Sequence, residues 1–301
     1  MEPTDGKRID DFDIAVINLD RRPDRMSDLY NKAPITFRRF PAIDGKNLSK
    51  HYFQFSDLLD AIRNQHRVLG EVGCSLSHYS LWKEHIERCD GRGRRHEHLL
   101  IFEDDVMFTN TSRAQYKRMT REISDGVIEK GFQFDLIYVG GQWTPDYDID
   151  GSNAPYFNFQ RTTRESLATY YHHESIVPGI YKRRNLSPAV IQGHRNVWYS
   201  PLFRTAGAYV ISQRGAKRLL EAVETDTALF MKTPLDMWLL EMDFRGYIDA
   251  FDRFPHPFYQ AGFEMVREPS HAVNDIHRGH FETIDIPRYF PSHSTIDGAI
   301  I

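Results

Sequence analysis

The sequence predicts an α/β protein in which a Rossmann-like, mostly parallel central sheet is flanked by helices. Short β-branched apolar runs alternate with stretches of helical period, which is the usual pattern of this class. The chain has 301 residues and 41% hydrophobic side chains, enough for a substantial core. No internal repeat or low-complexity linker interrupts it, so we expect one domain over residues 1–301.

The first strand and helix are expected at the start of this domain. Residues 12–19 form a β-branched apolar run, and Pro23 suits the first turn of the helix that follows. The same order recurs further along the chain, and two more helices are expected from their apolar spacing or from a proline at the start. The further strands are expected at 99–102, 134–139 and 206–212, and the further helices at 76–89, from 216 to 223 and from Pro234.

The expected domain has three parts. Residues 12–140 and residues 206–280 carry the expected strands and helices. Between them, residues 141–205 lose periodicity and are rich in tyrosine and tryptophan. A long irregular stretch inside a domain is usually a functional lid, a partner surface such as an acceptor or oligomer surface, or partly disordered.

Charge, hydropathy and cysteine content exclude several classes. Thirty-eight basic against 42 acidic side chains give a formal charge of −4, so we expect no nucleic-acid or anionic-lipid partner. No apolar stretch approaches the roughly 20 residues of a membrane span. Residues 1–8 are polar, the end of the chain shows no retrieval signal, and two cysteines fit a reducing compartment. The default expectation is a soluble cytoplasmic protein, with the compartment left open.

The acidic triplet Glu103-Asp104-Asp105 is the main candidate site, because it directly follows an apolar strand. Ligands of α/β proteins gather at the carboxyl ends of strands. Alternation in an extended segment would send Glu103 and Asp105 to the same side, where two carboxylates suit Mn²⁺ or Mg²⁺. A solvated acidic turn is the alternative.

Asp236 is the candidate general base, in the first turn of the helix that begins at Pro234. A carboxylate is favoured there by the helix dipole in any protein, so this position alone is weak evidence. Arg21, Arg22 and Arg25 form a charged turn after the first strand and could clamp a phosphate.

Fourteen histidines show no metal-binding spacing, although one late histidine could join two carboxylates around a metal. The candidates are His256, His271, His277 and His280. There is no glycine-rich phosphate loop and no nucleophile elbow.

Taken in order, seven blocks of the sequence resemble glycosyltransferase family 25, which holds collagen hydroxylysine galactosyltransferases and bacterial lipooligosaccharide galactosyltransferases. They look closer to the collagen-type members. The blocks are VINLDRRPDRM at 16–26, AIDG at 42–45, GEVGCSLSH at 70–78 with Trp82, LIFEDDV at 100–106, FDLIYVG at 134–140, AYVIS at 208–212 with Gly215-Ala216, and PLD at 234–236.

The resemblance implies a GT-A fold and inverting transfer from a UDP-sugar. It makes residues 12–140 the nucleotide-sugar-binding half and residues 206–280 the acceptor and catalytic half. Glu103 and Asp105 become the metal ligands, for Mn²⁺ or alternatively Mg²⁺, and Asp236 becomes the base. The remaining carried-over residues bind the sugar nucleotide. They are Asn18, Leu19, Arg21, Arg25, Asp44 and Asp104 on the nucleotide side and Glu71, Ser77 and His78 on the donor side.

The expected activity is transfer of a hexose, galactose first, to hydroxylysine of a collagen-like protein. UDP-glucose or UDP-N-acetylglucosamine as donor and a lipopolysaccharide-type acceptor remain open, as does a homodimer. Two other classes are a non-catalytic nucleotide-sugar-binding module and a metal-dependent phosphodiesterase or nucleotide-sugar hydrolase.

Overall fold

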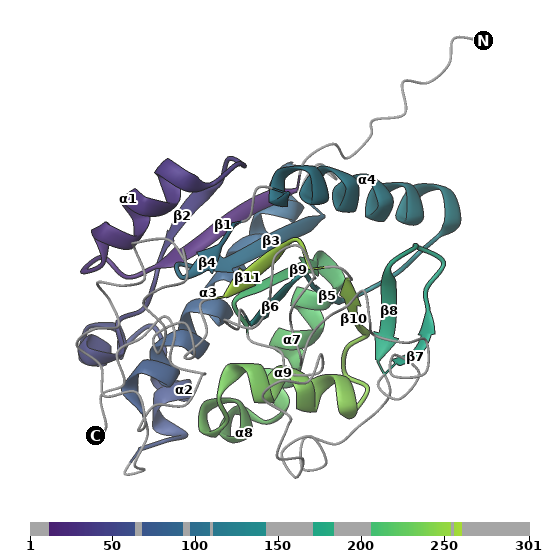
Figure 1. Ribbon diagram of the computed structural model, residues 1–301. Helices are drawn as coiled ribbons and strands as arrows, with labels where there is room; N and C mark the ends of the chain where they lie inside the picture. The colour runs from purple at the N-terminus through teal and green to yellow at the C-terminus, as the bar shows by residue number, and fades with distance from the viewer. Residues whose placement is uncertain are drawn as a thin grey trace, which may run out of the picture.

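The structure is a computed structural model. It describes residues 12–63, 68–92, 97–108, 111–142, 171–183, 206–253 and 256–260. A mixed sheet of eight strands runs through the middle and is flanked by helices (Figure 1). This confirms the predicted α/β class. The strand order is β2-β1-β3-β9-β5-β10-β8-β7.

The sheet is built from strands of all three predicted parts of the chain. Its members are β1 (Asp13–Asn18), β2 (Arg38–Pro41), β3 (His98–Glu103), β5 (Leu136–Tyr138), β7 (Tyr171–Glu174), β8 (Ile180–Arg183), β9 (Ala208–Ser212) and β10 (Ala250–Arg253). A smaller sheet has the order β4-β11-β6 and consists of β4 (Val106–Met107), β6 (Gly140–Gln142) and β11 (Phe258–Gln260). Because β9 lies between β3 and β5, the two halves share one sheet.

The expectation of mostly parallel pairing is wrong. Three pairs in the large sheet are parallel, β1 with β2, β1 with β3 and β5 with β10. Four are antiparallel, because β9 runs against both β3 and β5, and β8 runs against both β10 and β7. One reversed strand, such as β9 between β3 and β5, makes both of its pairings antiparallel. An apolar run buried on both faces reads the same in either direction.

Strand alternation divides the core into two layers, one on each face of the sheet. Leu99 and Ile101 of β3 pack on one face, while Leu100 and Phe102 pack on the other. The expected helices are present, and α4 and the short α2, α8 and η1 were not predicted. The helices are α1 (Pro23–Lys32), η1 (Gly45–His51), α2 (Ser56–Asp60), α3 (Leu69–Arg92), α4 (Ser112–Lys130), α7 (Gln213–Thr225), α8 (Thr227–Lys232) and α9 (Leu235–Phe244).

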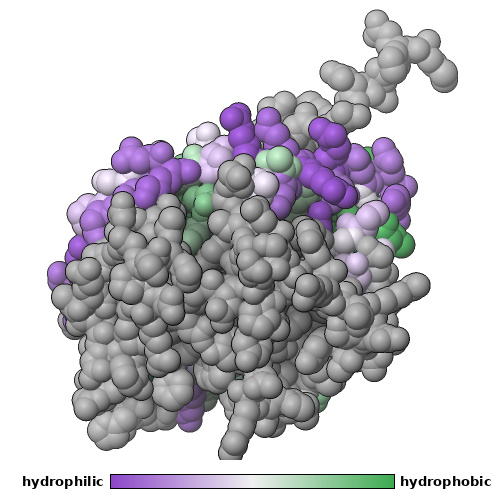
Figure 2. Space-filling model, in the orientation of Figure 1, coloured by the Kyte–Doolittle hydropathy of each residue, from purple (hydrophilic) through white to green (hydrophobic). Residues whose placement is uncertain are grey.

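The two layers contain different helices. Residues of α3, α7, α8 and α9 belong to one core cluster, and residues of α1 and α4 belong to the other. In α4 the inward positions Tyr116, Met119 and Ile123 follow the helical period, a signal that was present in the sequence. Figure 2 shows hydrophilic side chains gathered along the outer rim over α1 and α4, which are therefore amphipathic covering helices.

The segment expected to be irregular contains a hairpin, which corrects that expectation in part. β7 pairs antiparallel with β8, and β8 pairs with β10, so the hairpin extends the large sheet. A register shift between Tyr171 and His173 breaks the alternation by which a strand is recognised in a sequence. The rest of 141–205 lies outside the described residues, apart from the end of β6. Among the described helices, none is both long and apolar enough to cross a membrane.

Candidate active site

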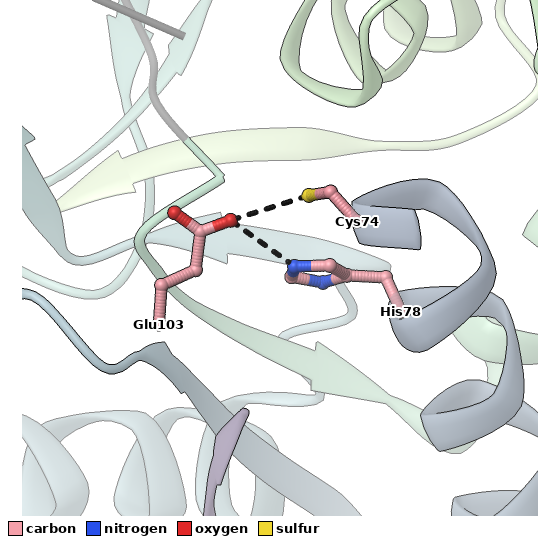
Figure 3. Close-up of side chains that lie close together, drawn as sticks. All are labelled: Cys74, His78 and Glu103. Atoms are coloured by element: carbon pink, nitrogen blue, oxygen red, sulfur yellow. Dashed lines mark hydrogen bonds and ion pairs between the residues drawn. The ribbon is translucent and has the colours of Figure 1, made fainter. Parts of the chain in front are cut away.

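Glu103 is the last residue of β3 and continues the face of the strand that carries Leu99 and Ile101. This face is covered by α3, so the carboxylate meets two side chains of that helix (Figure 3). Oε1 of Glu103 lies 3.4 Å from Sγ of Cys74 and 3.5 Å from Nε2 of His78. Glu103 is only 4% exposed. The end of the strand thus brings the buried carboxylate of Glu103 together with the half-buried thiol of Cys74 and the buried imidazole of His78.

The start of α3 is fixed by a close approach to the chain before η1. A Cβ added at Gly73 would lie 2.5 Å from the carbonyl oxygen of Ile43, so only glycine fits there. The hydroxyl of Ser77 donates to the carbonyl of Gly73 and accepts the backbone N–H of Ile43 at 2.8 Å. Ser77 therefore anchors the helix that carries Cys74 and His78. Whether Ser77 also contacts the sugar donor stays a prediction.

His78 is fully buried, and its ring is held by β9. Nδ1 lies 2.7 Å from the hydroxyl oxygen of Tyr209, which also accepts the indole N–H of Trp82 at 3.0 Å. The His78 and Tyr209 rings stack at 5.7 Å. Because one ring nitrogen is fixed by Tyr209, the other is directed at Glu103. Tyr209 was missed as a site residue, although it lies in the matching block at 208–212.

Asp236 lies in the first turn of α9, as predicted, and is 6% exposed. Burial, with smaller contributions from the charges of Glu103 and Glu71, raises the pKa of Asp236 to about 7, against a backbone hydrogen bond from Met237. Burial and the charges of Glu103, Asp236 and Glu71 also raise the pKa of the Cys74 thiol. Asp236, Glu103, Glu71 and Cys74 therefore share one electrostatic environment.

Asp104 points to the opposite face from Glu103, toward α1. Its carboxylate accepts from Nη1 of Arg25 at 2.6 Å and from Nδ2 of Asn18 at 2.8 Å. Burial raises the pKa of Asp104 more than Arg25 and Asn18 lower it. Three predicted nucleotide-side residues are thus joined in one buried network.

A second predicted pair lies beside this network. Nε of Arg21 donates to Asp44 at 3.0 Å, and Asp44 also caps η1 by accepting from the backbone N–H of Lys46. Arg39 was missed by the sequence reasoning and donates to the side-chain and backbone oxygens of Asn18. Leu19 is buried at 2% exposure. Whether these residues contact a nucleotide stays a prediction.

The alternation argument does not reach Asp105. β3 ends at Glu103, and Asp104 and Asp105 form a turn before β4, so the period of two does not apply. Asp105 is 4% exposed, and its metal role stays a prediction. Among the late histidines only His256 is described, and it is buried but outside the cluster around Glu103. His271, His277 and His280 lie outside the described residues.

The carboxylate oxygens of the acidic triplet at 103–105 are suited to a divalent cation. Glu103 and Asp105 are both buried carboxylates, which is the ligand type preferred by Mn²⁺ and Mg²⁺. Asp104 lies between them in the sequence and is already neutralised by Arg25. The chemistry of the triplet is therefore compatible with a cation held by its first and third residues.

Comparison with known proteins points to one family. The profile of glycosyltransferase family 25 (LPS biosynthesis protein) matches residues 12–238, which includes both Glu103 and Asp236. A rat protein named probable inactive glycosyltransferase 25 family member 3 is 29% identical over 87% of this chain and 39% of its own length. A Drosophila melanogaster glycosyltransferase 25 family member is 27% identical over 83% of this chain and 32% of its own. Human procollagen galactosyltransferase 2 is 33% identical over 42% of this chain and 20% of its own.

The chain therefore spans about two fifths or less of the length of these relatives. The family match nevertheless covers most of the chain, from residue 12 to residue 238. The chain belongs to glycosyltransferase family 25.

Proposed function

We propose that this glycosyltransferase moves a hexose, galactose first, from a UDP-sugar to hydroxylysine of a collagen-like protein, with Mn²⁺ and with inversion. One observation carries the proposal. Glu103 at the end of β3 and Asp236 at the start of α9 are both buried, and the charge of Glu103 contributes to the raised pKa of Asp236. The collagen acceptor is supported by the relative named procollagen galactosyltransferase 2.

Asp236 is the base in this proposal. A carboxyl with a pKa of about 7 exchanges a proton near neutral pH, which suits general base catalysis. The acceptor oxygen forms a bond to the anomeric carbon while the bond to the diphosphate oxygen breaks and UDP leaves with the electron pair. The hydroxyl proton moves to Asp236. A base of this kind contributes about 10²- to 10⁴-fold to the rate.

The cation would be held by Glu103 and Asp105. When bound, Mn²⁺ offsets the charge that develops on the departing diphosphate. Asn18, Arg21, Arg25 and Asp44 would bind the nucleotide, with Leu19 beside them.

Mass spectrometry of a hydroxylysine peptide incubated with protein, Mn²⁺ and a panel of UDP-sugars tests the proposal. The expected product is a hexose adduct that forms from UDP-galactose and is lost in Asp236→Asn. Glu241→Gln is the matched control, because it removes a carboxylate of the same helix that pairs on the surface with Arg245. A transfer rate in Asp236→Asn equal to that of the control would remove Asp236 from the mechanism.

A second function is favoured by the relatives named inactive. The chain would then be a nucleotide-sugar-binding module. Calorimetry that shows UDP binding, with no adduct on a hydroxylysine peptide or on a lipooligosaccharide acceptor, would support the module. UDP release that does not depend on acceptor would instead indicate a hydrolase.

A further inference from the structure

The cluster around Glu103 contains two side chains that oxygen-preferring cations do not require. Cys74 and His78 lie four residues apart on one face of α3, and both face the carboxylate of Glu103 (Figure 3). One ligand atom from each of the three residues lies within 4.8 Å of the others. This spacing on a helix is the one by which two histidines chelate zinc in other proteins.

Two of the three separations match the edges of a tetrahedral zinc site. Bond lengths of about 2.3 Å to sulfur and about 2.0 Å to nitrogen and oxygen predict a sulfur–oxygen edge of about 3.5 Å and a nitrogen–oxygen edge of about 3.3 Å. The corresponding separations are 3.4 Å for Cys74 and Glu103 and 3.5 Å for His78 and Glu103. A cation could therefore enter with only small movements of these side chains.

His78 supplies the second observation. Its Nε2 is buried, makes no hydrogen bond, and is directed at Glu103. When Nδ1 donates its proton to the hydroxyl oxygen of Tyr209, Nε2 presents its lone pair to the cluster. A hydrogen bond from the outer nitrogen is the usual support of a metal-binding imidazole. A buried nitrogen without a hydrogen bond is thus aimed at the position where a cation would lie.

We propose that Cys74, His78 and Glu103 bind a thiophilic divalent cation of the Zn²⁺ class. The thiol proton of Cys74 leaves to solvent, and the sulfur and the carboxylate together balance the two charges of the cation. Thiolate and imidazole ligands favour Zn²⁺, whereas Mn²⁺ favours oxygen. Three protein ligands leave one position for water or substrate.

The site has a consequence that rests on the proposed function. Glu103 would serve both the Zn²⁺ site and the Mn²⁺ that assists transfer, so the two cations compete for one carboxylate. Zn²⁺ then inhibits the transferase, and an excess of Mn²⁺ relieves the inhibition.

Binding is tested with Co²⁺, which gives an intense thiolate-to-cobalt absorption band when cysteine is a ligand. The chain has only two cysteines, Cys74 and Cys89, so the band reports on these alone. We expect the band in the metal-stripped wild type, its loss on adding Zn²⁺, and its absence in Cys74→Ser. Cys89→Ser is the matched control, because Sγ of Cys89 also lies beside an imidazole, 3.8 Å from Nδ1 of His85.

A second measurement avoids any variant. Zn²⁺ should slow alkylation of Cys74 in the wild-type protein, read by mass spectrometry, and leave Cys89 unchanged. No Co²⁺ band in the wild type, a band that survives in Cys74→Ser, or equal alkylation with and without Zn²⁺ would each overturn the site.

Failure of the site and failure of the proposed function give different results. Co²⁺ binding needs no transferase activity, so a protein with no activity still shows the band if the site is correct. Where transfer is observed, the Zn²⁺ concentration for half-inhibition should rise at least about tenfold in Cys74→Ser, measured against that variant's own rate without Zn²⁺.

Discussion

The hydroxyl oxygen of Tyr209 lies 2.7 Å from Nδ1 of His78, so strand β9 fixes the imidazole that faces Glu103. Tyr209→Phe removes the partner of two buried groups, His78 and the indole N–H of Trp82. We expect a stability loss of about 1–3 kcal/mol, because both groups become unsatisfied. Transfer should fall about 10- to 100-fold, as when a supporting hydrogen bond of a site is removed.

Urea denaturation and initial rates measure both effects. Tyr79→Phe is the control, since Tyr79 is a half-buried tyrosine of α3 whose ring packs on Phe55 and Phe230. If Tyr209→Phe behaves like Tyr79→Phe in both assays, Tyr209 does not position His78.

The ion pair of Arg25 and Asp104 should be a main support of the nucleotide side. Their atoms approach to 2.6 Å, and the side chain of Asp104 is fully buried. Arg25→Met leaves a buried carboxylate without its cation, so the free energy of unfolding should fall by about 3–5 kcal/mol. Asp104→Asn in the same chain should recover part of this loss, because the uncompensated charge is removed.

Arg22→Met is the matched surface change, since Arg22 pairs with the half-exposed Asp24 and exposed pairs contribute at most about 1 kcal/mol. Chemical denaturation of the wild type and these three variants gives the comparison. If the free energy of unfolding falls equally in Arg25→Met and Arg22→Met, the buried pair contributes no more to stability than the surface pair.

The sequence was sufficient for the elements but not for their directions. The run at 208–212 was correctly predicted as a strand, yet its central and reversed place between β3 and β5 depends on pairing with strands about 70 to 110 residues away. The same limit applies to the site. Cys74 and His78 visibly share a helix face, but their meeting with Glu103 depends on how α3 crosses β3, which no local pattern encodes.

The charge of Asp236 should make metal-free protein less stable as the pH rises. Its pKa is about 7 in the folded protein and near 3.8 when unfolded, so the folded state holds the proton over this range. Stability from this group is complete below about pH 4 and is lost as the pH rises to 7. At about 1.4 kcal/mol per pKa unit, Asp236→Asn should stabilise the protein at pH 8 by up to about 4 kcal/mol.

Urea denaturation in chelator at pH 5 and pH 8 tests this sign, with Glu241→Gln as the control on the same helix. The wild-type transfer rate should change in the opposite sense and rise as the pH approaches 7, because a base must be deprotonated. Stabilisation of Asp236→Asn that is equal at both pH values would show that its carboxyl does not titrate there.

Gly73 should tolerate no side chain. A Cβ would meet the carbonyl oxygen of Ile43 at 2.5 Å and the backbone nitrogen of Gly45 at 2.8 Å, and backbone atoms cannot move aside cheaply. Gly73→Ala should therefore destabilise by about 1–3 kcal/mol, despite the better helix propensity of alanine. Thermal unfolding measures the loss. Glu87→Ala, at an exposed position of the same helix, should change the stability little. An equally small effect of Gly73→Ala would contradict the close contact of Gly73 with Ile43 and Gly45.

His98 should make the protein sensitive to acid. Its ring stacks on Phe134 at 5.1 Å, and burial, with the nearby His85, lowers the pKa of His98 to about 4. The unfolded chain takes up this proton near pH 6.5, so stability from the neutral ring is complete above that pH and is lost as the pH falls to 4. The loss should reach about 3 kcal/mol at about 1.4 kcal/mol per unit.

Because Asp236 acts in the opposite direction over part of this range, the difference between wild type and His98→Phe isolates the histidine. Phenylalanine keeps an aromatic ring beside Phe134 but cannot be protonated. We expect the stability of His98→Phe relative to wild type to rise steadily between pH 6.5 and pH 4.5 in urea denaturation. His51→Gln, at a half-buried position in η1, is the control for the loss of a histidine elsewhere in the fold. A constant difference between His98→Phe and wild type would show that His98 takes up its proton as readily in the folded chain as in the unfolded one.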